Sequence, residues 1–142
     1  MIRRKPEDLA LRTRRFALMV VHLYASLPRS TVSNVLGRQL LRSGTSVGAH
    51  YREARRAKSD ADFISKIEGA LQELDESGYW IELLSDAHVA EGEIVEKLSK
   101  EIDELIAIFV TMVTRVKART MRAAVHLPAA RKERPTYPGA QA

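Results

Sequence analysis

The chain contains no cysteine, and only 6% of its 142 residues are aromatic. Without cysteine there can be no disulfide, no thiolate zinc site and no cysteine nucleophile. The longest apolar run, residues 16–25, is well short of the ~20 residues that a membrane-spanning helix needs. We therefore expect a cytoplasmic protein without a membrane partner, in which the 45% of apolar residues fill one core.

Apolar residues recur every three or four positions in four separate segments, a spacing typical of amphipathic helices. The pattern predicts helices over about residues 6–27, 31–57, 60–87 and 94–120. Helices of this length joined by short turns pack against their neighbours in antiparallel fashion. The predicted fold is all-α, an up-down-up-down four-helix bundle.

Helix boundaries are marked by residues that stop or cap a helix. Pro28 cannot lie inside a helix without loss of a hydrogen bond, so the first helix must end before it. Ser30 or Thr31 caps the second helix by accepting backbone N–H bonds. Ser59 and Asp62 are typical of a capping box, which predicts the start of the third helix.

The apolar periodicity is lost after about Thr120, where proline, small and basic residues follow. We predict that residues 1–120 form the bundle. Residues 121–142 are expected to be a flexible, basic tail containing prolines.

Small residues that form helices poorly gather at residues 43–48. They indicate either a loop or a place where two helices approach closely. We favour a close approach, because the apolar stripe keeps its phase from Leu40 through Val47 to Tyr51. The loop remains the alternative.

No pattern in the chain is typical of an active site. A di-iron bundle needs Glu-x-x-His on two helices, whereas this chain has only the reverse order, His50 followed by Glu53. Ser46 lies four residues before His50, but no strand-to-helix elbow accompanies them. Gly44 and Gly48 lack the lysine of a phosphate-binding loop. We predict no enzymatic activity, no metal, no cofactor and no small-molecule substrate.

The net charge of +5 conceals three blocks of charge. Residues 1–60 carry 13 basic and 4 acidic residues, and residues 61–104 carry 3 basic and 13 acidic residues. Residues 105–142 are basic again, with 7 basic residues and 1 acidic residue. Charge of one sign concentrated in a segment indicates either a solvated face or a surface that meets an oppositely charged partner.

Two basic clusters are candidates for binding RNA or DNA, because phosphate contacts need such clusters. In an antiparallel hairpin, the start of the first helix and the end of the second lie at the same end of the molecule. The alternative is that these charges are solvated and balanced by the acidic helices. The nucleic-acid candidates are Arg3, Arg4, Lys5, Arg12, Arg14, Arg15, Arg52, Arg55, Arg56 and Lys58.

Complementary basic and acidic helices also suit a head-to-tail contact between copies of the chain, which closes into a ring. Tyr79, Trp80 and Leu83 extend the apolar surface of the third helix beyond what one bundle stripe needs. Aromatic residues of this kind are common anchors at interfaces.

Residues 40–84 also resemble a known family. They contain R-S-G-T-S-V-G-A followed by E-A, then S-x-x-D-F-I-x-K, then A-L-x-E-x-x-E-x-x-Y-W-I-x-L-L. This pattern resembles the four-helix-bundle proteins whose genes were first noted within intervening sequences of bacterial large-subunit ribosomal RNA. The matching positions are 42–49, Glu53, Ala54, Ser59, Asp62, Phe63, Ile64, Lys66, Ala70, Leu71, Glu73, Glu76, Tyr79, Trp80, Leu83 and Leu84.

The resemblance implies a four-helix bundle that assembles as a cyclic homo-oligomer, a pentameric ring, with no established catalytic activity. It also implies a relative, the accessory variability determinant of diversity-generating retroelements. That relative is a basic ring that binds nucleic acid and a reverse transcriptase. One departure is His50, where the family more often has Asn.

The matching positions suggest a network at a subunit contact. We expect Arg42 to pair with Glu73 or Glu76, and Thr45 and Ser46 to bond within the same network. The full set of oligomer candidates is Arg42, Thr45, Ser46, Glu53, Glu73, Glu76, Tyr79 and Trp80.

The expected function is that of a non-catalytic, ring-forming assembly or adaptor module. The alternative is an accessory protein that binds RNA or DNA, with or without a reverse transcriptase, through its basic end and tail.

Overall fold

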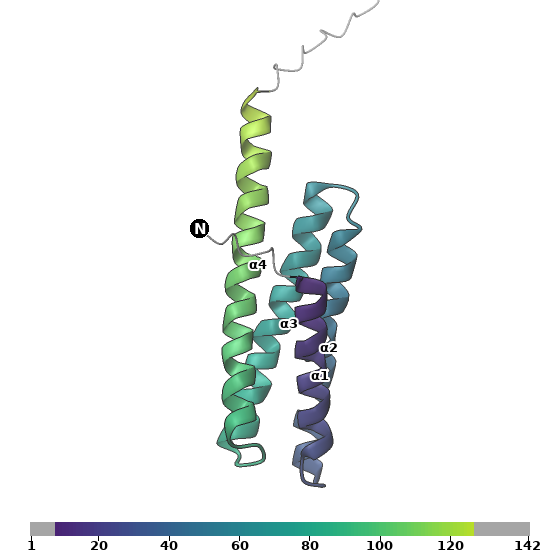
Figure 1. The fold of residues 1–142 in the computed structure, drawn as a ribbon, viewed down its shortest axis with the longest axis vertical. Coiled ribbons are helices and arrows are strands. Elements are labelled where there is room, and N and C mark those ends of the chain that lie inside the picture. Colours follow the sequence, from purple (N-terminus) through teal and green to yellow (C-terminus); the bar gives the residue numbers. More distant parts are fainter. Residues whose placement is uncertain (1–7, 127–142) are drawn as a thin grey trace, which may run out of the picture.

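The computed structural model describes residues 8–126, which form four α-helices in succession (Figure 1). The helices alternate in direction along the long axis of the molecule (Figure 1). This arrangement confirms the all-α, up-down-up-down four-helix bundle. The helices are α1 (Leu9–Ser26), α2 (Thr31–Arg55), α3 (Asp60–Asp86) and α4 (Glu93–His126).

Side-chain oxygens cap the first three helices. Asp8 Oδ1 accepts the N–H of Leu11 at 3.2 Å, at the start of α1. The cap of α2 is Ser30 rather than Thr31, since Ser30 accepts the N–H of Ser33 at 3.0 Å. Ser59 caps α3 as predicted, because its hydroxyl accepts the N–H of Asp62 at 3.1 Å. The expected first turn at residues 6–7 lies outside the described residues.

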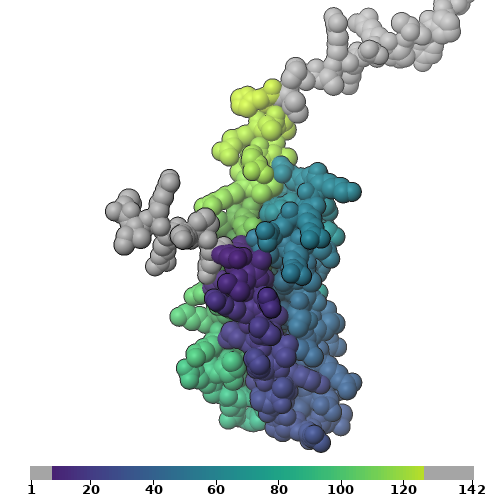
Figure 2. Space-filling model, turned by 45° about the vertical axis from the view of Figure 1, so that its right-hand side comes forward, coloured from purple at the N-terminus to yellow at the C-terminus, as the bar shows by residue number. Residues whose placement is uncertain are grey.

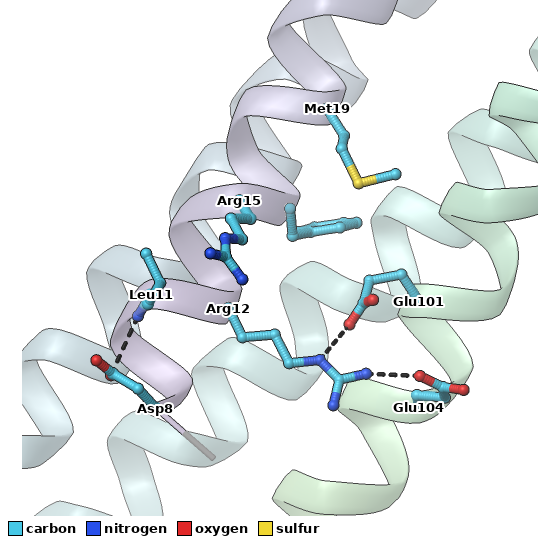
Figure 3. A pocket seen from close by; sticks show the side chains of 8 residues that line it. Asp8, Leu11, Arg12, Arg15, Met19, Glu101 and Glu104 are labelled. Carbon is cyan, nitrogen blue, oxygen red and sulfur yellow. Dashed lines mark hydrogen bonds and ion pairs between the residues drawn. The ribbon is translucent and has the colours of Figure 1, made fainter.

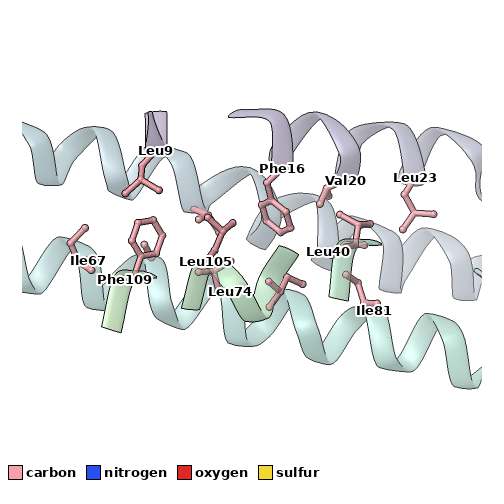
Figure 4. Close-up of a cluster of buried hydrophobic side chains, with 14 of the residues drawn as sticks. Leu9, Phe16, Val20, Leu23, Leu40, Ile67, Leu74, Ile81, Leu105 and Phe109 are labelled. Atoms are coloured by element: carbon pink, nitrogen blue, oxygen red, sulfur yellow. The ribbon is translucent and has the colours of Figure 1, made fainter. Parts of the chain in front are cut away.

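One apolar core runs through the middle of the bundle, and all four helices contribute to it (Figure 4). Its side chains come from the stripes that the periodicity predicted. Tyr51 of α2 and Phe109 of α4 stack across the core with ring centroids 5.9 Å apart. The largest fully buried side chains are Phe16, Phe109, Leu40, Ile67, Leu74, Ile81, Leu84, Leu98, Leu105, Val20, Val47 and Thr13.

The small residues of α2 lie where this helix approaches its neighbours. The helix is unbroken there, so the close approach is confirmed and the loop is wrong. A Cβ atom at Gly44 would lie 2.8 Å from Val20 Cγ2 of α1. On the other side of the helix, the buried hydroxyls of Ser43 and Ser77 lie 2.8 Å apart and join α2 to α3.

α4 is longer than the sequence pattern predicted. It continues to His126, six residues beyond the expected end near Thr120. Every residue from 117 to 126 is exposed, so packing ends where the apolar stripe ends but the helix does not. Residues 127–142 of the expected tail lie outside the described part of the chain. None of the four helices has the length and apolarity that a membrane crossing requires.

Candidate interaction surfaces

Charged and apolar side chains are combined on one outer surface formed by α2 and α3. On α2, positions 35, 42, 46 and 53 are spaced by seven, four and seven residues, which places them along one side of the helix. On α3, positions 73, 76 and 80 do the same. This surface, the α2–α3 face, comprises Val32, Val35, Arg42, Ser46, His50, Glu53, Lys66, Glu73, Glu76, Tyr79 and Trp80.

Arg42 joins the two helices at the centre of the α2–α3 face. Its Nη1 lies 3.3 Å from Glu73 Oε2, and its Nη2 donates to Glu76 Oε2. The hydrogen bond to Glu76, and then the charge of Glu73, raise the pKa of the Arg42 guanidinium above its usual value. The predicted pairing of Arg42 with these glutamates is confirmed. About half of the Arg42 side chain is exposed, so the pairs alone add little stability.

Thr45 and Ser46 do not take part in this network, so that part of the prediction is wrong. The Thr45 hydroxyl donates to the carbonyl of Leu41 at 2.7 Å. The Ser46 hydroxyl donates to the carbonyl of Arg42 at 2.6 Å. Inside a helix, the carbonyl four residues back is the nearest acceptor for a serine or threonine hydroxyl. These two side chains therefore bond to their own backbone and not across to α3.

His50 lies beside the Arg42 cluster without a close bond to it. Its Nε2 is 3.9 Å from Glu73 Oε1, and its buried Nδ1 has no hydrogen-bond partner among the described residues. The ring occupies space that Gly69 leaves open, because a Cβ at Gly69 would lie 2.9 Å from the ring. The histidine therefore fills a gap between α2 and α3.

Apolar side chains surround the charged cluster. Val35 and Tyr79 are 56% and 54% exposed, respectively. Tyr79 makes an edge-on contact with the half-buried Trp80, with ring centroids 5.0 Å apart. The indole Nε1 of Trp80 is buried and has no hydrogen-bond partner within residues 8–126. The face therefore offers exposed apolar area around a fixed set of charges.

Comparison with known proteins identifies the family. The family model described as "23S rRNA-intervening sequence protein" matches residues 8–111. The chain belongs to this family. A search of curated proteins gives no match.

A solved member of the S23 ribosomal protein family, from Bacteroides thetaiotaomicron VPI-5482, has the same fold. It is 34% identical to this chain, with a TM-score of 0.67, and its function is described as unknown. The similarity covers 98% of that protein but only 75% of this chain. The match to the 23S rRNA-intervening sequence protein family includes the whole α2–α3 face and ends inside α4.

The predicted nucleic-acid residues are distributed unevenly in the structure. Arg3, Arg4 and Lys5 lie outside the described residues. Arg12 turns toward α4, where its Nε and Nη2 each lie 2.6 Å from a carboxylate oxygen, those of Glu101 and Glu104 (Figure 3). Arg12 is therefore part of the contact between α1 and α4 and is a poor candidate for phosphate binding.

The other cations gather at one end of the bundle, as expected for an antiparallel hairpin. Arg14 of α1 and Arg52 of α2 line the same surface groove. Arg55, Arg56 and Lys58 follow at the turn between α2 and α3, and all three are exposed. Within the described residues, none of these five side chains forms an ion pair with an acidic side chain, although the backbone N–H of Lys58 donates to Asp62. Arg15 also lines a groove, beside Arg12.

Sequence reasoning missed several members of the α2–α3 face. Val32 and Val35 were not selected, although Val35 lies seven residues before Arg42 and so shares its side of the helix. Lys66 forms an ion pair with Glu53 at 3.2 Å, and both positions match the family pattern. Helical spacing along α2 is sufficient to predict that the valines lie near Arg42. The ion pair between Lys66 and Glu53 could not be predicted in this way, because it depends on how α2 and α3 are aligned with each other.

Proposed function

We propose that this 23S rRNA-intervening sequence protein is a non-catalytic assembly module that forms a cyclic homo-oligomer through its α2–α3 face. The observation that carries the proposal is the combination of exposed Val35 and Tyr79 with the Arg42 cluster on that face. Apolar anchors around a few ordered charges are typical of the centre of a specific protein interface.

A second apolar surface supports a ring rather than a symmetric dimer. Leu11, Leu18 and Val21 are exposed on the outer side of α1, away from the α2–α3 face. A contact between two different surfaces is head-to-tail, and it closes into a ring when the rotation permits. The charges agree with this arrangement, because Arg14 and Arg15 flank the α1 stripe whereas acidic residues dominate α3.

The proposed ring contains five copies, as the resemblance to the family implies. In this arrangement the α1 stripe of one copy covers the α2–α3 face of the next. In this proposal the ring acts as a scaffold for partners. Within residues 8–126, no group of histidines and carboxylates is placed to hold a metal ion.

The test is the solution mass by light scattering coupled to size exclusion, at low and at high salt. We expect about five times the 15.9 kDa of one chain. Arg42→Ala should lower the mass. Arg38→Ala should not, because Arg38 is an exposed arginine of the same helix that forms no ion pair within residues 8–126. A monomeric wild-type protein would contradict the proposal.

A second candidate function is nucleic-acid binding, favoured by the cations without acidic partners at the α2–α3 turn. Phosphate contacts release counterions, so the affinity should fall steeply with salt. Binding of a labelled hairpin RNA or a DNA duplex, measured over a series of salt concentrations, tests this function. Binding that does not change with salt would contradict it.

A further inference from the structure

The end of α4 forms a helical arm that lies beyond the residues of the family match. The family match ends at residue 111, and the solved relative covers only 75% of this chain. Residues 115–126, the α4 arm, nevertheless continue the helix, and the last turns of the arm extend beyond the other three helices (Figures 1 and 2). At its full length, the arm is about 18 Å long.

The base of the α4 arm is held in a fixed direction by α3. Lys117 Nζ lies 3.1 Å from Glu68 Oε1, and Arg119 Nη2 lies 3.2 Å from Asp60 Oδ1. The Thr120 hydroxyl also donates to Asp60, at 3.1 Å. Beyond Thr120 the arm has only exposed residues, two of them alanines, which favour a helix. The arm is therefore oriented before any partner arrives.

The charge of the α4 arm is of one sign. Residues 105–126 contain four basic residues and no acidic residue. Arg115, Arg119 and Arg122 are spaced by four and three residues, which places them on one side of the helix. Arg115 and Arg122 are exposed and pair with no acidic side chain within residues 8–126. Two arginines of this stripe are thus available to an anionic partner.

The arginine stripe continues into the basic end of the bundle. A surface groove at the base of the arm is lined by Arg55 and Lys58 from the α2–α3 turn and by Arg119 from α4. Asp60, which pairs with Arg119, is the one acidic residue among the described residues that line this groove. The cations of two separate segments therefore form one surface. An extended polyanion can contact such a surface at several points, whereas a single small anion cannot.

We propose that the α4 arm binds the phosphate backbone of a nucleic acid together with the α2–α3 turn. This inference rests on the second candidate function and assigns it a site. Arginine suits phosphate because its planar guanidinium donates two parallel hydrogen bonds. In the proposed ring, cyclic symmetry places the arms of all copies on one side, which multiplies the contacts with a long strand.

A membrane surface is the less favoured partner. The arm does expose Met121 and Val125, which are 71% and 80% accessible. Membrane-surface helices usually present a broad apolar face with Trp, Phe or Leu, and the arm has none of these residues. Its tethers to α3 also restrict how far it can lie flat on a bilayer.

The experiment measures binding of a labelled hairpin RNA and of a DNA duplex by fluorescence anisotropy over a series of salt concentrations. The arm variant is Arg115→Gln/Arg122→Gln in the full chain. The control is Arg29→Gln/Arg38→Gln, which removes the same charge from exposed arginines toward the other end of the bundle. Melting followed by circular dichroism is the control that checks whether each variant keeps its helices.

We expect the arm variant to bind about ten-fold more weakly than wild type, because two phosphate contacts are lost. The slope of log affinity against log salt should become shallower by roughly 1.5, and the control should match wild type. An equal loss of affinity in the arm variant and in the control would overturn the assignment of the binding site to the arm, but not nucleic-acid binding itself. A wild-type protein that binds neither the hairpin RNA nor the DNA duplex would overturn both.

Discussion

Helix α1 packs against α2 on one side and against α4 on the other, and we call each contact between two helices a seam. The two seams of α1 are held together by different interactions. Toward α2, the helices approach closely because α2 presents glycine to the β-branched side chain of Val20. Toward α4, the contact is the least extensive in the bundle, and Arg12 spans it to reach Glu101 and Glu104 (Figure 3). One seam depends on shape and the other on charge.

This difference explains where the bundle tolerates change. Close-packed helices lose stability when even one methyl group is added, since their neighbours have nowhere to move. Ion pairs at the surface contribute less, and salt screens them. The α2 seams should therefore dominate the folding free energy, and the α1–α4 seam should respond mainly to ionic strength.

The largest effect is expected from Gly44→Ala. The added Cβ would lie within 3.2 Å of three atoms of Val20, so we expect a loss of about 1–3 kcal/mol in unfolding free energy. Gly78→Ala is the matched control, because its Cβ would meet only Ile102, at 3.9 Å. The control should gain up to about 1 kcal/mol from helix propensity. Denaturant unfolding measures the unfolding free energy of both variants. An equal gain in stability in the two variants would refute close packing of α2 against α1 at Gly44.

An intermediate effect is expected at the buried pair of hydroxyls between α2 and α3. Ser77→Ala leaves the Ser43 hydroxyl without its partner across the seam and should lower the unfolding free energy by about 1 kcal/mol. The double variant Ser43→Ala/Ser77→Ala should lose less than the sum of the two single variants. Strictly additive losses in a denaturant titration would show that the pair does not couple the helices.

The smallest effect is expected from Arg12→Gln in the α1–α4 seam. The partly exposed ion pairs predict a loss of at most about 1 kcal/mol, which should shrink at high salt. Arg15 lines the same groove but forms no ion pair with any other described residue, so Arg15→Gln should have almost no effect. Thermal melting at two salt concentrations checks both variants. A loss for Arg12→Gln that is unchanged at high salt would argue against a seam held by charge.

Periodicity predicted the fold and most of the core from the sequence, because buried stripes recur with the helical repeat. Phe16, Val20 and Leu40 are buried as their spacing indicates. The end of α4 could not be predicted in this way, since an exposed helix needs no apolar stripe. In the end of α4, alanines that favour a helix and ion pairs with α3 stabilise the helix without an apolar stripe.

The candidate sites were predicted only in part. Arg42 was paired correctly because the positions that match the family pattern include the arginine and both glutamates. Ser46 was assigned to the wrong acceptor because a hydroxyl in a helix bonds first to its own backbone. The cluster of basic residues at the start of the chain also did not predict that Arg12 pairs with Glu101. That ion pair depends on where α4 lies relative to α1, which local sequence does not indicate.

The central claim is self-assembly through the α2–α3 face, and one pair of variants tests it most directly. Tyr79 on that face and Val110 on α4 are both large apolar side chains, 54% and 47% exposed. We predict that Tyr79→Ala lowers the mass measured by sedimentation equilibrium, while Val110→Ala keeps the mass of the wild-type ring. Identical masses for wild type, Tyr79→Ala and Val110→Ala across a dilution series would contradict the account.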